Sequence, residues 1–128
     1  MKQGTNFILP VQIEYDLEQV KSIDFIFKQS ALKNKNEYST REILKGVEKT
    51  FTYPSETATL SETEENVINL HWTAKDTYIF MPEGEPVYMD TRINLNNSAE
   101  NPETEIVKIQ MLPTLFKPEK GGTKNDKG

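Results

Sequence analysis

The stretch Val87-Tyr88-Met89-Asp90-Thr91-Arg92-Ile93-Asn94-Leu95 carries the most regular pattern in the sequence. Four of its five odd-numbered residues are apolar and the fifth is a threonine, whereas the even-numbered residues between them carry polar groups. Successive side chains of a β-strand point to opposite faces of a sheet, so a period of two predicts a strand with one buried face. This stretch therefore predicts a strand that covers a core, and it favours an all-β fold.

Shorter stretches with the same period lie on both sides of it. Every odd position of residues 7–15 is apolar, and in residues 22–28 only Ile26 interrupts the polar face. Residues 47–53, 68–72 and 107–111 repeat the alternation. Pro10 cannot donate a backbone hydrogen bond, which predicts that the first strand lies at a sheet edge or carries a bulge.

The connections between these strands are short. Residues 16–20 predict a turn or a single helical turn, and residues 73–77 a short turn before Tyr78-Ile79-Phe80. Residues 55–65 contain four glutamates and no basic residue, which predicts a solvated acidic loop. Residues 96–102 are rich in turn-forming residues and predict a hairpin loop.

Six or seven short strands separated by turn signals, with no clear amphipathic helix, predict an immunoglobulin-like β-sandwich of about seven strands. A flattened barrel is the alternative architecture. We expect residues 1–116 to form this single domain and residues 117–128, which contain no apolar residue, to be a disordered tail. The predicted core comprises Leu9, Val11, Ile13, Phe25, Phe27, Phe51, Leu70, Trp72, Phe80, Met89, Ile93, Val107 and Ile109.

Composition excludes several classes of function. The 128-residue chain has no cysteine and a single histidine, His71, which excludes disulfides, thiol catalysis and sites that need two imidazoles. Its net charge of −5 argues against binding nucleic acid through its phosphates. There is no long apolar run, and residues 1–5 lack a signal-peptide core, so we expect a soluble, unsecreted protein without a membrane partner.

No pattern in the sequence indicates catalytic, cofactor-binding or metal-binding residues. His71 falls on the polar face of its strand without an evident partner for base catalysis. Four acids lie near one another in the sequence, Asp76, Glu83, Glu85 and Asp90, and they suggest a third hypothesis. In this hypothesis the chain is a small hydrolase that uses Asp90 or Glu85. We therefore predict that the chain is not an enzyme and needs no cofactor.

A binding face is the strongest candidate site. Tyr88, Asp90 and Arg92 share the polar side of the central strand, where they would form either a ligand contact or a cross-strand ladder that stabilises the sheet. Tyr78 joins this candidate face as an aromatic residue. Exposed tyrosines, Tyr38 among them, would stack on sugar rings if the domain bound carbohydrate or a receptor. Open sheet edges offer another mode of binding, since unpaired strand groups can accept a strand from a neighbouring subunit.

Three segments resemble a group of small structural proteins of tailed phages and prophages from low-GC Gram-positive bacteria. They are Lys2-Gln3-Gly4-Thr5-Asn6-Phe7, residues 16–29 with the acid-Leu start and the final Gln29, and Asp76-Thr77-Tyr78-Ile79-Phe80 followed by residues 87–95. The resemblance implies an immunoglobulin-like, non-enzymatic virion protein of the head, neck, tail or baseplate. Its partners would be other virion proteins and further copies of itself, assembled in the bacterial cytoplasm. A carbohydrate- or receptor-binding sandwich is the alternative function.

Overall fold

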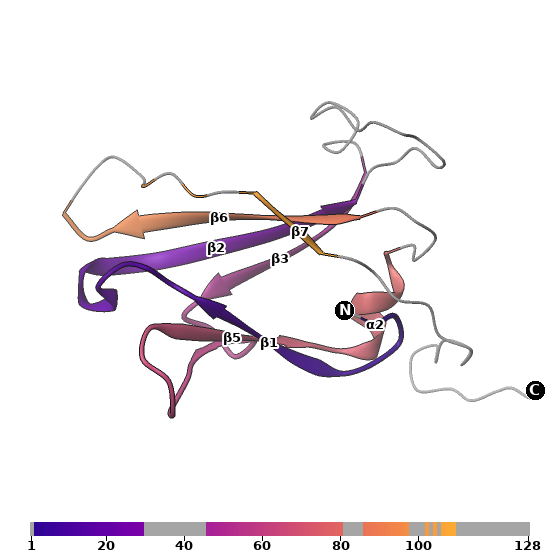
Figure 1. The fold of residues 1–128 in the computed structure, drawn as a ribbon, viewed down its shortest axis with the longest axis horizontal. Helices are drawn as coiled ribbons and strands as arrows, with labels where there is room; N and C mark the ends of the chain where they lie inside the picture. The colour runs from indigo at the N-terminus through magenta and orange to yellow at the C-terminus, as the bar shows by residue number, and fades with distance from the viewer. Residues whose placement is uncertain are drawn as a thin grey trace, which may run out of the picture.

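The computed structural model describes residues 2–29, 46–80, 86–97, 102, 104 and 106–109, and they form two antiparallel sheets. The three-stranded sheet has the order β1 (Phe7–Gln12), β5 (Val67–Trp72), β4 (Ala58–Leu60). The four-stranded sheet has the order β3 (Val47–Tyr53), β2 (Val20–Gln29), β6 (Val87–Leu95), β7 (Val107–Ile109). The sheets lie as two layers, one above the other (Figure 1). The predicted all-β fold is confirmed.

The two sheets enclose one apolar core with a cluster of aromatic rings at its centre. The ring of Trp72 on β5 lies 4.7 Å from that of Phe27 and 4.9 Å from that of Phe51, on the opposite sheet. Phe7 stacks on the same indole at 5.8 Å. Aromatic pairs at these separations contribute about 0.5–1.5 kcal/mol beyond the area that they bury. The core therefore joins the layers through contacts between residues that are distant in the sequence.

Most of the predicted core is confirmed. The buried members are Ile13, Phe25, Phe27, Phe51, Leu70, Trp72, Phe80, Met89 and Ile93. Leu9, Val11 and Ile109 are only partly buried against this cluster. Val107 is 44% exposed, so its predicted burial is wrong. It pairs with Met89 and faces the other sheet, but that sheet ends at β1, and no strand in the described part of the chain covers the Val107 side chain.

The first two strands belong to different sheets, and a short 3-10 helix, η1 (Leu17–Gln19), joins them. The carboxylate of Asp16 accepts a hydrogen bond from the backbone N–H of Glu18 and so caps the helix. This confirms the single helical turn predicted for residues 16–20. The tight connection crosses from one layer to the other because the residues on both sides of it bury their apolar faces in the same core.

Two predicted connections contain regular structure. Residues 73–77 are not a plain turn, because Ala74–Tyr78 form the helix α2. The Thr73 hydroxyl accepts from the N–H of Asp76, whose carboxylate accepts from the N–H of Thr73 in return. Such a capping box starts a helix even where no apolar periodicity marks it. The predicted acidic loop 55–65 includes β4, whose Ala58 is completely buried.

Some predictions concern residues outside those that the structure describes. They are the tail 117–128, Met111, Tyr38, Glu83, Glu85 and part of the hairpin loop 96–102.

Candidate functional site

The outer face of the four-stranded sheet brings three of the four predicted binding residues together. On β6, Tyr88 pairs with Lys28 of β2, Asp90 with Ile26 and Arg92 with Asp24. Even-numbered residues of both strands thus share the face that points away from the core. A shallow hollow of about 340 Å³ lies on this face between Asp24, Ile26, Thr50, Asp90, Thr91 and Arg92.

Asp24 is the centre of a hydrogen-bond network on this face. Its carboxylate accepts from the Thr52 hydroxyl at 3.0 Å, from Arg92 Nη2 at 3.2 Å and from Asn94 Nδ2 at 3.3 Å. Partial burial of Asp24 acts to raise its pKa, but the hydrogen bonds from Thr52, Arg92 and Asn94 and the charge of Arg92 outweigh this effect. The pKa of Asp24 is therefore lowered from its ordinary value of 3.8.

This geometry is that of a ladder across three strands. Arg92 directs its guanidinium to Asp24, and Lys28 Nζ lies 2.8 Å from Glu48 Oε1 on β3. These side chains pair across neighbouring strands, and such cross-strand pairs contribute to the stability of a sheet.

Tyr78 does not belong to this face. It lies in α2 at one end of the two layers, beside the N-terminus (Figure 1). Its ring lies against Gly4, where an added Cβ would come within 2.8 Å of Tyr78 Cζ. The φ angle of Gly4 is +77°, a conformation that residues with a Cβ rarely adopt. Both this backbone conformation and the close contact with the Tyr78 ring therefore require glycine. Tyr78 and Tyr88 thus do not form a shared aromatic platform for a sugar ring.

The other titratable candidates are separated as well. His71 is half-buried on the three-stranded sheet, with Nε2 2.9 Å from the Thr59 hydroxyl. Asp76 caps α2 and lies 3.3 Å from Lys49 Nζ, whereas Asp90 lies on the outer face of β6. The structure does not combine Asp76 and Asp90 into the paired carboxylates of a glycosidase.

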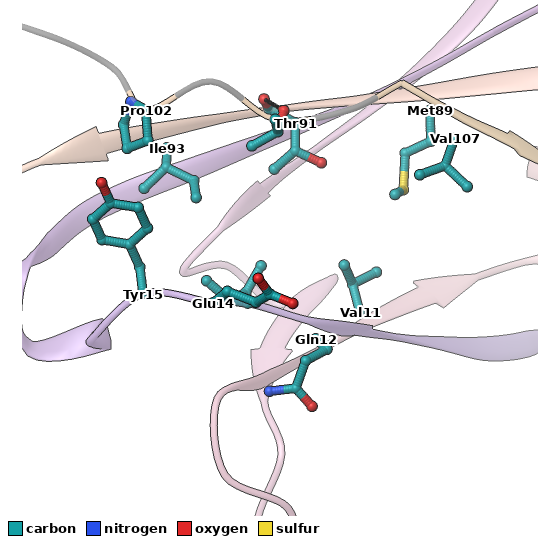
Figure 2. A pocket seen from close by; sticks show the side chains of 11 residues that line it. Val11, Gln12, Glu14, Tyr15, Met89, Thr91, Ile93, Pro102 and Val107 are labelled. Atoms are coloured by element: carbon teal, nitrogen blue, oxygen red, sulfur yellow. Dashed lines mark hydrogen bonds between the residues drawn. The ribbon is translucent and has the colours of Figure 1, made fainter.

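Sequence reasoning missed a cleft between the two sheets. It has a volume of about 580 Å³ and opens on the side where one sheet ends at β1 and the other at β7. Tyr15 and Val11 point from the β1 side toward Ile93, Met89 and Val107 (Figure 2). The lining is completed by Gln12, Ile13, Glu14, Thr91, Pro102 and Thr104.

Exposed apolar side chains gather at the rim of this cleft. Tyr15 is 38% exposed and Val107 is 44% exposed, and both line the cleft. Thr104 fixes the upper rim, because its hydroxyl donates a 2.6 Å hydrogen bond to the carbonyl oxygen of Thr91. An apolar cleft with exposed apolar residues at its rim is the kind of surface that binds another protein.

Two sequence signals, taken together, could have indicated this cleft. Pro10 predicts that the first strand lies at a sheet edge or carries a bulge, and the alternation of residues 7–15 continues past it to Ile13 and Tyr15. Those last two residues face the interior but leave the ladder, since β1 ends at Gln12. Only the arrangement of the two sheets shows that Val107 and Met89 face them across an open side.

Within the described residues, no three histidine, cysteine or acidic side chains are placed to hold a metal ion. In the same part of the chain, no helix is long and apolar enough to cross a membrane. Comparison with family models, with curated proteins and with solved structures gave no match for this chain.

Proposed function

We propose that this chain is a non-enzymatic, immunoglobulin-like protein-binding module that serves as a structural or assembly component of a phage or prophage particle. It acts through protein–protein contacts, in several copies, within the head, neck, tail or baseplate. The site of contact is the open side of the two sheets, and the observation that carries the proposal is the cleft there, which the exposed side chains of Tyr15 and Val107 line.

The order of the strands supports an immunoglobulin-like assignment. Immunoglobulin domains have strands A, B, E and D in one sheet and C, F and G in the other, and variable types add C′ beside C. If β1 is strand B, the order β1-β5-β4 corresponds to B-E-D, and β3-β2-β6-β7 corresponds to C′-C-F-G. Strand A has no counterpart among the described residues, and its place would be the outer edge of β1.

A protein-binding role is also supported by what the two candidate surfaces contain. On the outer face, the side chains of Thr52, Arg92 and Asn94 are hydrogen-bonded to Asp24. The cleft instead leaves Tyr15 and Val107 substantially exposed, and contact with another protein would remove this apolar surface from water. The resemblance of residues 2–7, 16–29 and 76–80 with 87–95 to small virion proteins supports the particle as the place of these contacts.

The experiment is quantitative peptide mass spectrometry of purified particles induced from the source strain, measured against the major capsid protein. We expect the chain at a fixed number of copies per particle. Particles carrying the cleft variant Tyr15→Ser with Val107→Ser should contain fewer copies of the chain. The control variant Glu56→Ser, on the exposed turn before β4, should not change the copy number. Absence of the unmodified chain from intact particles would refute the proposal.

A further inference from the structure

Among the residues that the structure describes, no strand pairs with the outer edge of β1, so the open side of the two sheets has room for one more strand. Resting on the proposed function, we infer that an extended segment of a different protein adds antiparallel to the end of β1 at Val11–Gln12, continues beside residues 13–15 and closes the cleft. The segment alternates apolar residues, which enter the cleft, with polar residues that face solvent. One of its polar residues is basic and lies beside Glu14.

The backbone of β1 offers the hydrogen bonds for such an addition. The N–H of Ile13 donates to the carbonyl of Asn66 at 2.7 Å, and Gln12 stands opposite Val67 in the ladder. In an antiparallel pair, neighbouring residues alternate between bonding to the partner strand and pointing away from it. Odd-numbered residues therefore bond to β5, and the backbone N–H and C=O groups of Gln12 point to the outside.

Pro10 sets the limit of this edge. It is one of the residues whose backbone points away from β5, and it has no N–H to donate. An added strand thus loses a hydrogen bond at Pro10 but not at Gln12, two residues later. The cleft begins at Val11, the residue that follows Pro10. The part of the chain whose outward N–H groups can bond to an added strand therefore lies beside the cleft.

The side chains on the walls specify an apolar face for the incoming segment. A strand beside β1 directs every second side chain toward the opposite sheet. There it would meet Met89, Thr91 and Val107, which already face the cleft from β6 and β7 (Figure 2). The 44% exposure of Val107 reflects the missing cover, and the added side chains would supply it.

Charge identifies the partner as a different protein with a basic residue. Glu14 is exposed and is the one charged residue among the described residues that line the cleft. A second copy of this chain, with a net charge of −5, would bring another Glu14 and another Pro10 to the same edge. Opposite charges on neighbouring strands attract and like charges repel, so a lysine or arginine fits beside Glu14.

The test uses a displayed library of random linear ten-residue peptides, selected on the full-length chain. The deciding variants are Gln12→Pro, which removes the outward N–H, and Gln12→Ala, which keeps it but loses the same side-chain bonds to Glu65 and Asn66. Leu60→Pro is the matched control. Its N–H points away from β5 on the far edge of the same sheet, because Ser61 bonds to Val67. Circular dichroism confirms that each variant is folded.

We expect the selected peptides to alternate apolar and polar residues and to include a basic residue. A synthetic copy should bind the unmodified chain, Gln12→Ala and Leu60→Pro alike, and should bind Gln12→Pro about tenfold more weakly. Glu14→Lys should reverse the preference for a basic residue, whereas Glu56→Lys should not. In NMR hydrogen exchange, the amide of Gln12 should become protected when the peptide binds.

Several results would overturn strand addition. The first is equal peptide binding by Gln12→Pro and Gln12→Ala, and the second is a selection that yields no alternating peptides. The third is a free chain that forms a dimer which only Gln12→Pro disrupts, because a second copy would then be the occupant. The proposed function is decided separately by the copy number in particles. If Gln12→Pro and Gln12→Ala enter particles equally well at fixed stoichiometry, the particle role stands and strand addition fails.

Discussion

Replacing Phe25 by alanine tests which face of β2 supports the core. The Phe25 side chain is completely buried and stands between Phe51 of β3 and Thr91 of β6 in the ladder. Removing a buried phenylalanine ring costs about 3–5 kcal/mol, because the apolar contacts are lost and a cavity remains. A domain of this size has a total unfolding free energy of about 5–15 kcal/mol, so the change should be large in any denaturation curve.

The assay is urea denaturation followed by tryptophan fluorescence, since the single Trp72 is itself buried in the core. Ile26→Ala is the matched control. Ile26 is the next residue of the same strand, and its half-buried side chain lies on the outer face beside Thr50. We expect a loss of about 1 kcal/mol for Ile26→Ala, because only part of that side chain is removed from water.

The comparison of the two variants decides the outcome. A loss below about 1 kcal/mol for Phe25→Ala, where 3–5 kcal/mol is typical of a buried ring, would refute the assignment of the buried face. A larger loss for Ile26→Ala than for Phe25→Ala would refute it as well. If Phe25→Ala does not fold, Phe25→Leu replaces it, with an expected loss of up to about 1.5 kcal/mol.

Three further changes test local features of the fold. Gly4→Ala should destabilise by at least about 1–2 kcal/mol in thermal melts, because φ is +77° and the new Cβ would meet the Tyr78 ring; an unchanged melting temperature would contradict this. Thr73→Ala should cost about 1 kcal/mol in urea, since the N–H of Asp76 loses its capping acceptor, and Thr63→Ala on an exposed turn should cost less. Asp24→Asn should lower the free energy of unfolding at pH 7. This loss should shrink as the pH falls from about 5 through the lowered pKa of Asp24, because a carboxyl with a lowered folded pKa stabilises the fold only when it is ionised. An equal loss in urea curves at neutral and acidic pH would rule this out.

Local patterns account for the parts of the fold that the sequence predicted well. The alternation in residues 87–95 and the apolar residues Ile23, Phe25 and Phe27 gave strands with the correct buried faces, since side-chain direction in a strand depends only on the period of two. β4 was missed because three residues are too short for a period to be seen. The helix α2 was missed because it is defined by a capping box and not by apolar spacing.

The candidate site shows the same division. The sequence placed Tyr88, Asp90 and Arg92 on one face, and the structure has them there. It could not show that Asp24 and Thr52, which are 28 residues apart, would meet beside Arg92 and complete a ladder, because that depends on which strands become neighbours. Tyr78 was grouped with these residues by type alone, and its position in α2 separates it from them.

The sequence by itself determined that this is an all-β protein and which residues of each long strand face the core, and Pro10 limited the first strand to a sheet edge or a bulge. These properties follow from the backbone and from a repeat of two residues. Only the tertiary structure decided that β1 and β7 end their sheets on the same side. In the part of the chain that the structure describes, the three-stranded sheet does not extend past β1 to cover Val107, and this leaves the cleft between the two sheets.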